Sequence, residues 1–499
     1  MIEIATDYKS LYEESTLEIV SLKHEISNLK RLIFGSKSES FIPQNTPSTQ
    51  LSLDIQAEAI ATCSVTKAQK IEYTRQQLEI KKNHPGRTKL PEHLERHEII
   101  IEPTQKAEGC KKIGDEVTEE LEYEPGKLFV NRYIRPKYVM ADNSQIIIAP
   151  MVERPLPKAI VGPGLLAQII IDKYVDHLPL YRQEQRFKRE GVDIAYSTIS
   201  DWIKNGCALL DPLGEALKKI VISSDYLHAD ETPVKVLPAR LRHSGGDKNK
   251  KGTTHRGFYW VYHNSLDNLV WFDYREGRGR EGPNQILKDF KGYLQTDGYN
   301  VYDIFKENKD ITVLHCMAHA RRKFFEAKEN NAAVAEYALE QIGLLYAIER
   351  KAQEQQLTAG EIFELRQAEA LPILESLGKW MKEIYLTSLP KSTIGKALGY
   401  SVQRWPELMM YASDGKLNID NNPVENSIRP VAIGRKNYLF AGSHEAAGRS
   451  GMLYSFLGTC KLNGINPFIW LQDVLRRISN HPINKIEELL PQNWKPLLN

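Results

Sequence analysis

Residues 418–443 read NIDNNPVENSIRPVAIGRKNYLFAGS and surround a single glutamate, Glu425, with asparagines and several cationic side chains. Such a mixture suits phosphate chemistry. Asn422 is expected to cap a helix that has Pro423 in its first position and Glu425 in its third. Glu425 then has two interpretations: it is half of a capping box that closes back on Asn422, or it is a functional carboxylate.

The size and composition of the chain limit its class. With 499 residues the chain is too long for one core, and its length predicts about three domains. The 66 Lys and Arg residues nearly balance the 64 Asp and Glu residues, so nucleic-acid binding must come from local basic patches. The five cysteines are scattered and form no Cys-x-x-Cys pair, which favours a reducing compartment. No apolar run approaches the ~20 residues of a membrane span, and the N-terminus lacks signal-peptide features. We therefore expect a cytoplasmic protein without a membrane partner.

The N-terminal 40 residues have the pattern of a coiled-coil helix. Apolar residues from Tyr12 to Ile33 recur every seven positions, with leucines between them. This seam either pairs two or more copies of the chain, as a homodimer or higher oligomer, or packs on its own domain. The next segment, 41–88, is rich in Ser, Thr, Gln and Pro and is expected to be a flexible linker.

Two modules are expected between residues 89 and 222. Alternating β-rich runs predict a small β domain over 89–150. Helical patterns over 151–222 include two helices separated by Gly191, the second capped by Ser197 or Thr198, in a layout typical of helix-turn-helix units. This pair either binds DNA or belongs to a helical bundle without a binding role. The cations of its first helix that would contact DNA are Arg186, Lys188 and Arg189.

The rest of the chain alternates between strand and helix. Residues 223–330 contain three consecutive strand candidates, a short helix and a fourth strand, which predict a mixed sheet with helical cover. Residues 331–412 are almost wholly helical in pattern and are expected to form an insertion. Residues 413–499 would complete the sheet domain with the Glu425 helix and two apolar-faced helices.

Three acids stand out by their surroundings: Asp230 inside an apolar strand, Asp297 at the end of another, and Glu425. Asp230 alone could be a turn residue or half of an ion pair, and Asp297 alone could be the turn residue of an Asp-Gly pair. Together, acids on neighbouring strands and a helix are what a two-cation phosphoryl-transfer site requires. Glu231 competes for the first position, although strand alternation should place it opposite Asp230, with His228 on the Asp230 face.

Four separated strings carry a family resemblance, in order: HADETPVKVL, TDGYNVY, HCMAHARRKFFEA and NNPVENSIRPVAIGRKNYLFAGS. They resemble the catalytic core of the insertion-sequence 66 family of DDE transposases, and the similarity extends over nearly the whole chain. The resemblance implies a multidomain α/β protein with a ribonuclease H-like core, interrupted by a helical insertion, whose triad is Asp230, Asp297 and Glu425. It also implies that Cys316 and His319 form a Cys-x-x-His element of the kind seen after the second Asp in some such enzymes. Their other interpretation is a helix start with a buried thiol.

The cofactors and partners follow from these expectations. The acids are expected to bind Mg²⁺, with Mn²⁺ as a substitute. Many family members carry a small zinc module, but here only Cys110 of its cysteines remains, so no zinc is expected. The partners are DNA of the terminal repeats, target DNA and element-encoded accessory proteins, in the cytoplasm at the nucleoid. The expected phosphate-binding cations are Arg429, Arg435, Lys436, Arg321 and Arg322, and Asn422 is an accessory residue of the site.

Three functions fit these features. The first is a DNA transposase that cleaves and transfers strands at terminal inverted repeats. The second is a sequence-specific DNA-binding protein without catalysis, which the intact acids disfavour. The third is a metal-dependent DNA nuclease without strand transfer, which would use the same acids.

Overall fold

The computed structural model describes residues 90–103, 111–124, 126–139, 146–237 and 254–496. The chain divides into two compact units, Met1–Asn83 and His84–Asn499, and all described residues belong to the second. The coiled coil expected over 1–40, the linker expected over 41–88 and Cys110 therefore lie outside the described residues. Among the residues that are described, no helix has the length and apolar character needed to cross a membrane.

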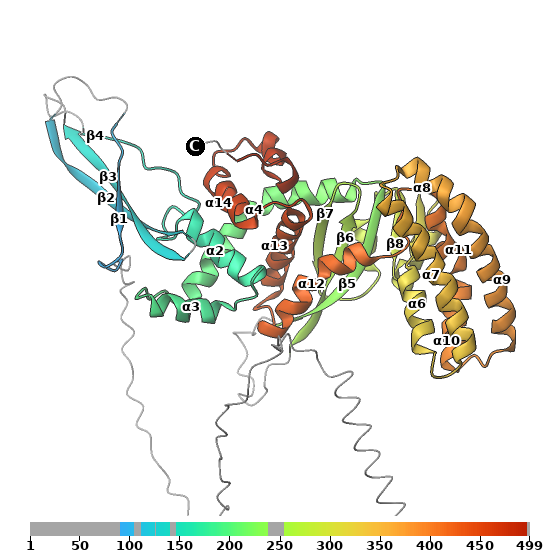
Figure 1. Cartoon of the computed structure of the whole chain (residues 1–499). Helices are drawn as coiled ribbons and strands as arrows, with labels where there is room; N and C mark the ends of the chain where they lie inside the picture. Colours follow the sequence, from blue (N-terminus) through green and yellow to red (C-terminus); the bar gives the residue numbers. More distant parts are fainter. Residues whose placement is uncertain (1–89, 104–110, 125, 140–145, 238–253, 497–499) are drawn as a thin grey trace, which may run out of the picture. The chain divides into compact units, whose positions relative to one another are not determined.

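A small β-sheet forms the first described module (Figure 1). Its order is β1-β3-β2; β1 is parallel to β3, whereas β2 and β4 are antiparallel to it. The sequence did not predict β2, because its Lys- and Glu-rich run gains strand character only by pairing along β3. The strands are β1 (Arg96–Ile100), β2 (Lys111–Glu124), β3 (Lys127–Val139) and β4 (Ile146–Ile148).

Three helices connect this sheet to the larger one: α2 (Pro163–Tyr174), α3 (Leu180–Arg189) and α4 (Tyr196–Ile222). Gly191 follows α3 with φ of +81°, a left-handed conformation that ends helices and favours glycine. The expected cap of α4 is wrong, because α4 begins at Tyr196 after Ala195. Ser197 and Thr198 therefore lie inside its first turn, and Glu184 of α3 accepts a hydrogen bond from the Tyr196 N–H at 3.1 Å.

A five-stranded mixed sheet with the order β7-β6-β5-β8-β9 lies at the centre of the larger module. β5, β8 and β9 are parallel, and β6 is antiparallel to both β5 and β7. The predicted mixed sheet with helical cover is confirmed, but β9 was not predicted, although its Ile, Thr and Val residues favour strands. The strands are β5 (Tyr226–Val236), β6 (His255–Asn264), β7 (Leu269–Arg275), β8 (Gly292–Thr296) and β9 (Ile311–His315).

The segment where a helical insertion is expected is helical. It forms a second apolar core, which is anchored on the sheet through Tyr226 of β5 and Leu314 of β9. Short helices α5 (Glu281–Ile286) and η1 (Asn300–Glu307) precede it. α6 (Met317–Glu326) precedes the expected bounds of 331–412. The insertion consists of α7 (Ala332–Glu354), α8 (Ala359–Leu365), η2 (Arg366–Ala370), α9 (Leu371–Thr387), α10 (Thr393–Gln403), α11 (Trp405–Met409) and η3 (Met410–Ser413).

The C-terminal helices return to the sheet (Figure 1): α12 (Asn422–Asn437) packs against β5 and β6, and α13 (His444–Leu462) against β7. Small residues let α13 lie directly on the backbone of β7. The N–H of Phe272 donates to the Ser455 hydroxyl at 2.8 Å, and the N–H of Val270 donates to the Thr459 hydroxyl at 3.3 Å. The helix thereby satisfies backbone groups of an edge strand that would otherwise be open to pairing with another chain. The chain continues through α14 (Pro467–Arg477), η4 (Ile483–Leu489) and η5 (Pro491–Asn493).

Gly451 of α13 is required by this close approach. A Cβ at Gly451 would lie 2.8 Å from the Phe272 carbonyl oxygen, whereas a Cβ at Gly448 meets nothing within 4 Å. We expect Gly451→Ala to lower the free energy of unfolding by about 1–3 kcal/mol, because the strand backbone must move. Gly448→Ala should raise it by about 0.5–1 kcal/mol, as alanine favours the helix. Chemical denaturation of the two variants measures both effects, and equal stability would contradict this packing.

Candidate active site

Asp230 and Asp297 lie side by side on neighbouring strands. The parallel register of β5 and β8 pairs His228 with Gln295, and each aspartate lies two residues further along its strand direction. Each carboxylate is oriented by one backbone group: Asp230 Oδ1 accepts from the Glu231 N–H at 2.7 Å, and Asp297 Oδ1 from the Tyr299 N–H at 2.8 Å. One oxygen on each aspartate is thus left for another ligand. Asp297 is therefore also the turn residue of its Asp-Gly pair.

Glu425 reaches the same region from the first turn of α12. The expected cap Asn422 is wrong by one residue: Asn421 is the N-cap, and its side chain makes no cap hydrogen bond, whereas Asp420 Oδ1 accepts from the Asn422 N–H at 3.0 Å. The capping box does not form, because Asn421 uses its amide to bind β5. The Glu425 Oε1 atom is buried without a hydrogen-bond partner and lies 3.7 Å from His319 Nδ1.

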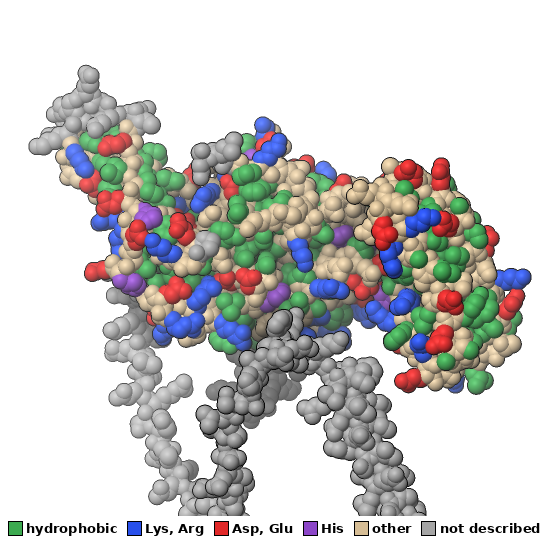
Figure 2. All heavy atoms as spheres, viewed as in Figure 1, with side chains coloured by type: hydrophobic (Ala, Val, Ile, Leu, Met, Phe, Trp, Pro, Cys, Tyr) green, Lys and Arg blue, Asp and Glu red, His purple; other side chains and the backbone are tan. Residues whose placement is uncertain are grey.

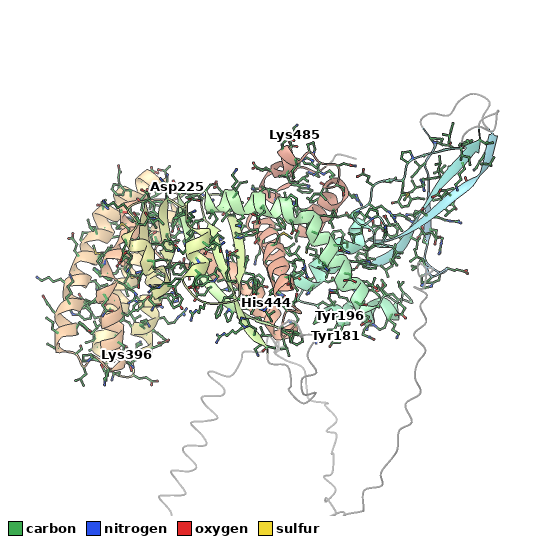
Figure 3. The ribbon with its side chains drawn as sticks, turned by 180° about the vertical axis from the view of Figure 1, so that it is seen from behind. Tyr181, Tyr196, Asp225, Lys396, His444 and Lys485 are labelled. Atoms are coloured by element: carbon green, nitrogen blue, oxygen red, sulfur yellow. The ribbon has the colours of Figure 1, made fainter. Side chains whose placement is uncertain are left out.

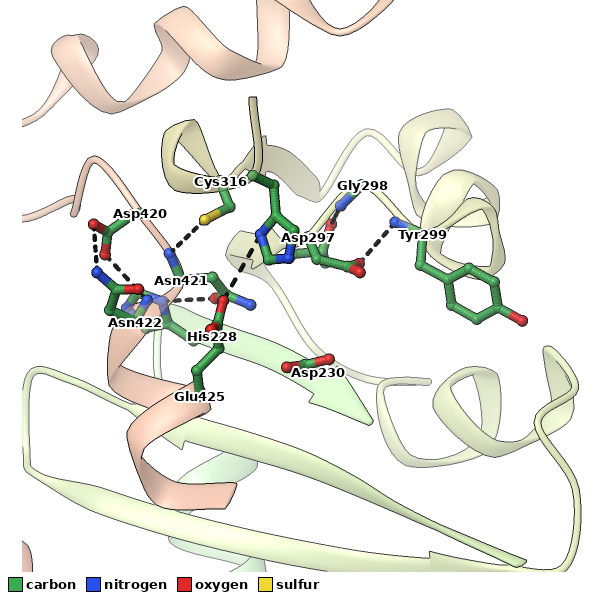
Figure 4. A network of polar contacts seen from close by, with 12 residues as sticks. His228, Asp230, Asp297, Gly298, Tyr299, Cys316, Asp420, Asn421, Asn422 and Glu425 are labelled. Carbon is green, nitrogen blue, oxygen red and sulfur yellow. Dashed lines mark hydrogen bonds and ion pairs between the residues drawn. The ribbon is translucent and has the colours of Figure 1, made fainter. Parts of the chain in front are cut away.

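Asn421 connects three elements behind the acids (Figure 4). Its side-chain Nδ2 donates to the Ala229 carbonyl, and its Oδ1 accepts from His228 Nδ1, both at 3.0 Å. Its backbone N–H donates to Cys316 Sγ at 3.1 Å. His228 accepts from the Asn418 amide through Nε2, and complete burial lowers the pKa of His228 to about 3. His228 is therefore a neutral residue whose hydrogen bonds join β5 to the segment that leads into α12.

The helical insertion holds the Asp297 turn in place. Tyr400 of α10 donates its hydroxyl to the Asp297 carbonyl at 2.7 Å, and Arg404 donates to the Gly298 carbonyl at 3.2 Å. Gly298 has a φ of +86°, and a Cβ there would lie 2.8 Å from Arg404 Nε. Sequence reasoning missed both insertion residues, because no local pattern indicates a contact across about one hundred positions.

The carboxylates influence one another electrostatically. The pKa of Asp230 is raised well above its ordinary value, first by burial and then by the negative charges of Asp297 and Glu231, with a smaller contribution from Glu425. Burial also raises the pKa of Glu231, while its ion pair with Arg278 opposes the shift. Arg278, which the sequence reading missed, stacks over the Tyr299 ring at 4.1 Å. Glu231 is thus bound to an arginine through Oε1, although its Oε2, like Oε1 of Glu425, is buried without a hydrogen-bond partner.

The raised pKa predicts a pH-dependent stability. Because folded Asp230 retains its proton above its unfolded pKa of about 3.9, stability without metal should fall as pH rises through and beyond that value. We expect Asp230→Asn, in chelator at pH 7.5, to unfold about 2–4 °C above the unsubstituted protein. This advantage should shrink toward pH 4, where both forms are neutral. The exposed residue Asp289 supplies the control Asp289→Asn, and a thermal scan in which both variants behave alike would contradict the assignment.

The cationic residues differ in what they already contact. Arg321 and Arg322 are exposed on α6 and line an open hollow together with Arg350, which was not predicted from the sequence. On α12, Arg429 and Lys436 are exposed, whereas Arg435 donates to the Pro233 carbonyl and burial lowers its pKa. Figure 2 shows Lys and Arg side chains over the region of α3 and α12.

On α3, Arg186 forms an ion pair with Asp172 of α2, so its charge already has a partner. Lys188 and Arg189 are exposed. Of the three expected α3 cations, these two are therefore the ones free to meet phosphates.

A separate cavity of about 310 Å³ lies between α3, α4, α12 and α13. Tyr181 and Tyr196 line it from α3 and α4 and lie close together (Figure 3), and Arg435 and Tyr438 line it from α12 and the residue that follows. This hollow is lined in part by aromatic side chains and contains none of the three acids.

Comparisons with known proteins place these features in a family. The model described as "Transposase IS66 family" matches residues 158–449, "IS66 C-terminal element" matches 455–492, and "Transposase C of IS166 homeodomain" matches 21–99. These matches confirm the resemblance expected from the motifs.

Similar full-length proteins come from Sinorhizobium fredii. Uncharacterized protein y4hP is 32% identical over 96% of this chain and 89% of its own length. Uncharacterized protein y4jD is 30% identical over 97% and 96%. A solved structure, a Mos1 transposase paired-end complex with left transposon end, matches 53% of this chain and 82% of its own at 12% identity. Its TM-score of 0.13 is too low to support an argument about the fold.

Proposed function

The chain belongs to the IS66 family of transposases, and from this we propose that it cleaves DNA at the terminal inverted repeats of an insertion sequence and transfers the freed strand to target DNA. One observation carries the proposal. Asp230 and Asp297 on adjacent parallel strands and Glu425 on α12 meet closely enough for the charges of the other two acids to shift the pKa of Asp230. Acids that serve only as surface charges have no reason to gather against their own repulsion.

We infer that the core is ribonuclease H-like. The argument rests on the strand order β7-β6-β5-β8-β9, in which β6 alone runs opposite to the other strands, and on Asp230 within β5 and Asp297 directly after β8. Helices α7 to α11 lie in the chain between the last strand and Glu425, where the family resemblance implies an insertion.

The donor atoms of the triad suit Mg²⁺, with Mn²⁺ as a substitute. Both are hard cations that prefer oxygen ligands, and the triad offers only carboxylate oxygens. The unpartnered Oε1 of Glu425 and the second oxygens of the two aspartates are the atoms available to hold them. Bound there, the cations would stabilise the attacking and leaving oxygens of an in-line displacement at phosphorus. Zinc is not expected to act as the cofactor.

The residues of the chain itself have three tasks in this proposal. The backbone N–H groups of Glu231 and Tyr299 orient the aspartates, and the Asn421 network fixes the start of α12. Asp230 must lose its proton for cation binding, so binding releases a proton to solvent. The exposed cations hold DNA phosphates and carry no base information.

Glu425→Gln tests the assignment, because glutamine keeps the shape of the side chain and removes the charge that binds a cation. Cleavage of a labelled terminal-repeat DNA in Mg²⁺ should fall by at least about 10²-fold, while binding of that DNA survives. Asp230→Asn and Asp297→Asn should behave alike, and Glu231→Gln should keep measurable activity. Glu445, an exposed acid in the first turn of α13, gives the matched control Glu445→Gln.

Each alternative has its own outcome in this assay. Normal cleavage by Glu425→Gln would remove Glu425 from the triad and leave Asp420 as the next acid to test. Specific binding without cleavage by the unsubstituted protein would indicate a DNA-binding protein. Cleavage without joining to a target plasmid would indicate a nuclease.

Lys436 is suited to a test of the phosphate contacts, because its side chain is exposed whereas Arg435 also supports β5. Lys436→Gln should weaken binding evenly across DNA sequences and lower the slope of log K against log salt by about one unit. Lys485→Gln, an exposed lysine on η4, should leave that slope unchanged. A loss confined to one DNA sequence would instead indicate base reading by Lys436.

The assembly remains part of the proposal. A homodimer or higher oligomer would bring two terminal repeats together, with the N-terminal heptads as the pairing element. Element-encoded accessory proteins are proposed as further partners.

A further inference from the structure

Glu425 also belongs to a second cluster of potential ligands. Cys316 precedes α6, His319 lies in its first turn, and Glu425 lies in the first turn of α12. One ligand atom from each of the three residues lies within 4.8 Å of the other two. Among the described residues, Cys316, His319 and Glu425 form the cluster in which at least three His, Cys, Asp or Glu side chains lie close enough to share one ion.

Two of these atoms lack a hydrogen-bond partner. His319 Nδ1 and Glu425 Oε1 are both buried and unpartnered, and the 3.7 Å between them is too long for a hydrogen bond. Ligands of a tetrahedral zinc ion lie roughly 3.3–3.6 Å apart at the usual bond lengths. The pair is therefore already near ligand spacing, and unsatisfied buried polar atoms of this kind require a partner.

The third ligand is prepared for a metal by its surroundings. Cys316 Sγ accepts from the Asn421 N–H at 3.1 Å, and Cys316 is the N-cap of α6, where the helix dipole favours negative charge. Burial raises the pKa of the thiol to about 12, so ligation requires its proton to leave as the metal–sulfur bond forms. Cys316 is completely buried, whereas the side chains of His319 and Glu425 are 23% and 30% exposed, which leaves a fourth position to water.

We propose that Cys316, His319 and Glu425 form an inhibitory site for a thiophilic divalent cation of the zinc class. Sulfur and imidazole ligands select Zn²⁺ over Mg²⁺, which prefers oxygen. A zinc ion held there uses the carboxylate that the triad needs, so it inactivates the enzyme without being its cofactor. Ligation rests on these three side chains alone, whereas the inhibitory effect rests on the proposed function.

Cobalt(II) is the probe for ligation, because a thiolate ligand gives bound cobalt a characteristic near-ultraviolet charge-transfer band. Chelator-treated full-length protein should bind one Co²⁺ with this band, and one equivalent of Zn²⁺ should abolish it, even in excess Mg²⁺. Cys316→Ser should lose the band, and His319→Gln and Glu425→Gln should weaken Zn²⁺ binding at least about tenfold. Cys460→Ala removes a buried thiol elsewhere and should keep the band.

Absence of the band in the unsubstituted protein overturns the site whatever the variants do, so misfolding of a variant cannot protect the proposal. A band that persists in Cys316→Ser with a native circular dichroism spectrum also overturns it. A band lost in Cys460→Ala instead of Cys316→Ser would assign the metal to another thiol and do the same.

Inhibition is measured separately on Mg²⁺-dependent cleavage of terminal-repeat DNA. Half-inhibition of the unsubstituted protein should occur near half an equivalent of Zn²⁺, and Cys316→Ser, compared with its own zinc-free rate, should require at least about tenfold more. Equal zinc sensitivity of the two proteins overturns the inhibitory role. A cobalt band in a protein that cleaves no DNA would leave the metal site standing and remove the proposed function instead.

Discussion

The buried side chain of Asn421 is the constraint on which the site depends. It is completely buried, and its amide and backbone N–H contact β5 and the start of α6 at the point where α12 begins. A buried amide that loses its partners costs about 1–3 kcal/mol for each group left unsatisfied. The entry of α12 is therefore held in one arrangement, and Glu425 follows one turn later at a fixed distance from the strands. Tyr400 and Arg404 act similarly on the other side, where they hold the backbone of the Asp297 turn.

The same geometry has an electrostatic cost that the rest of the fold must offset. Burial and neighbouring negative charges oppose ionisation of Asp230, so the carboxylates destabilise the folded chain unless a cation joins them. The large core around the mixed sheet, which includes the buried Trp260 and Trp470, supplies the stabilising burial. The hydroxyls of Ser455 and Thr459 add hydrogen bonds at the β7 edge, where Phe272 lies in register with Asp230 two strands away.

The local sequence indicated the candidate site where a residue departs from the pattern of its neighbours. An aspartate inside an apolar strand and a glutamate beside Pro423 drew attention to Asp230 and Glu425, and the strand periods predicted a mixed sheet. The missing parts depend on contacts between distant segments. β2 looks like a charged loop until it pairs with β3, and the cap at Asn421 rather than Asn422 follows from a hydrogen bond to β5. Tyr400 and Arg404 are ordinary residues of the helical insertion, and only its packing places them beside the Asp297 turn.

Glu425 has two possible sets of companions, and the chemistry of the cation decides between them. With Asp230 and Asp297 it completes a set of hard oxygen donors, and with Cys316 and His319 a set that contains sulfur and nitrogen. One carboxylate cannot bind a cation in both sets at once, because Asp230 and Asp297 lie on the sheet whereas Cys316 and His319 lie at the start of α6. Cys316 cannot be regarded as a metal ligand alone, since its sulfur also receives the Asn421 N–H that orients α12. The thiol that would capture a soft cation therefore also helps to position the carboxylate for a hard one, so the two sets are coupled through the backbone of a single residue.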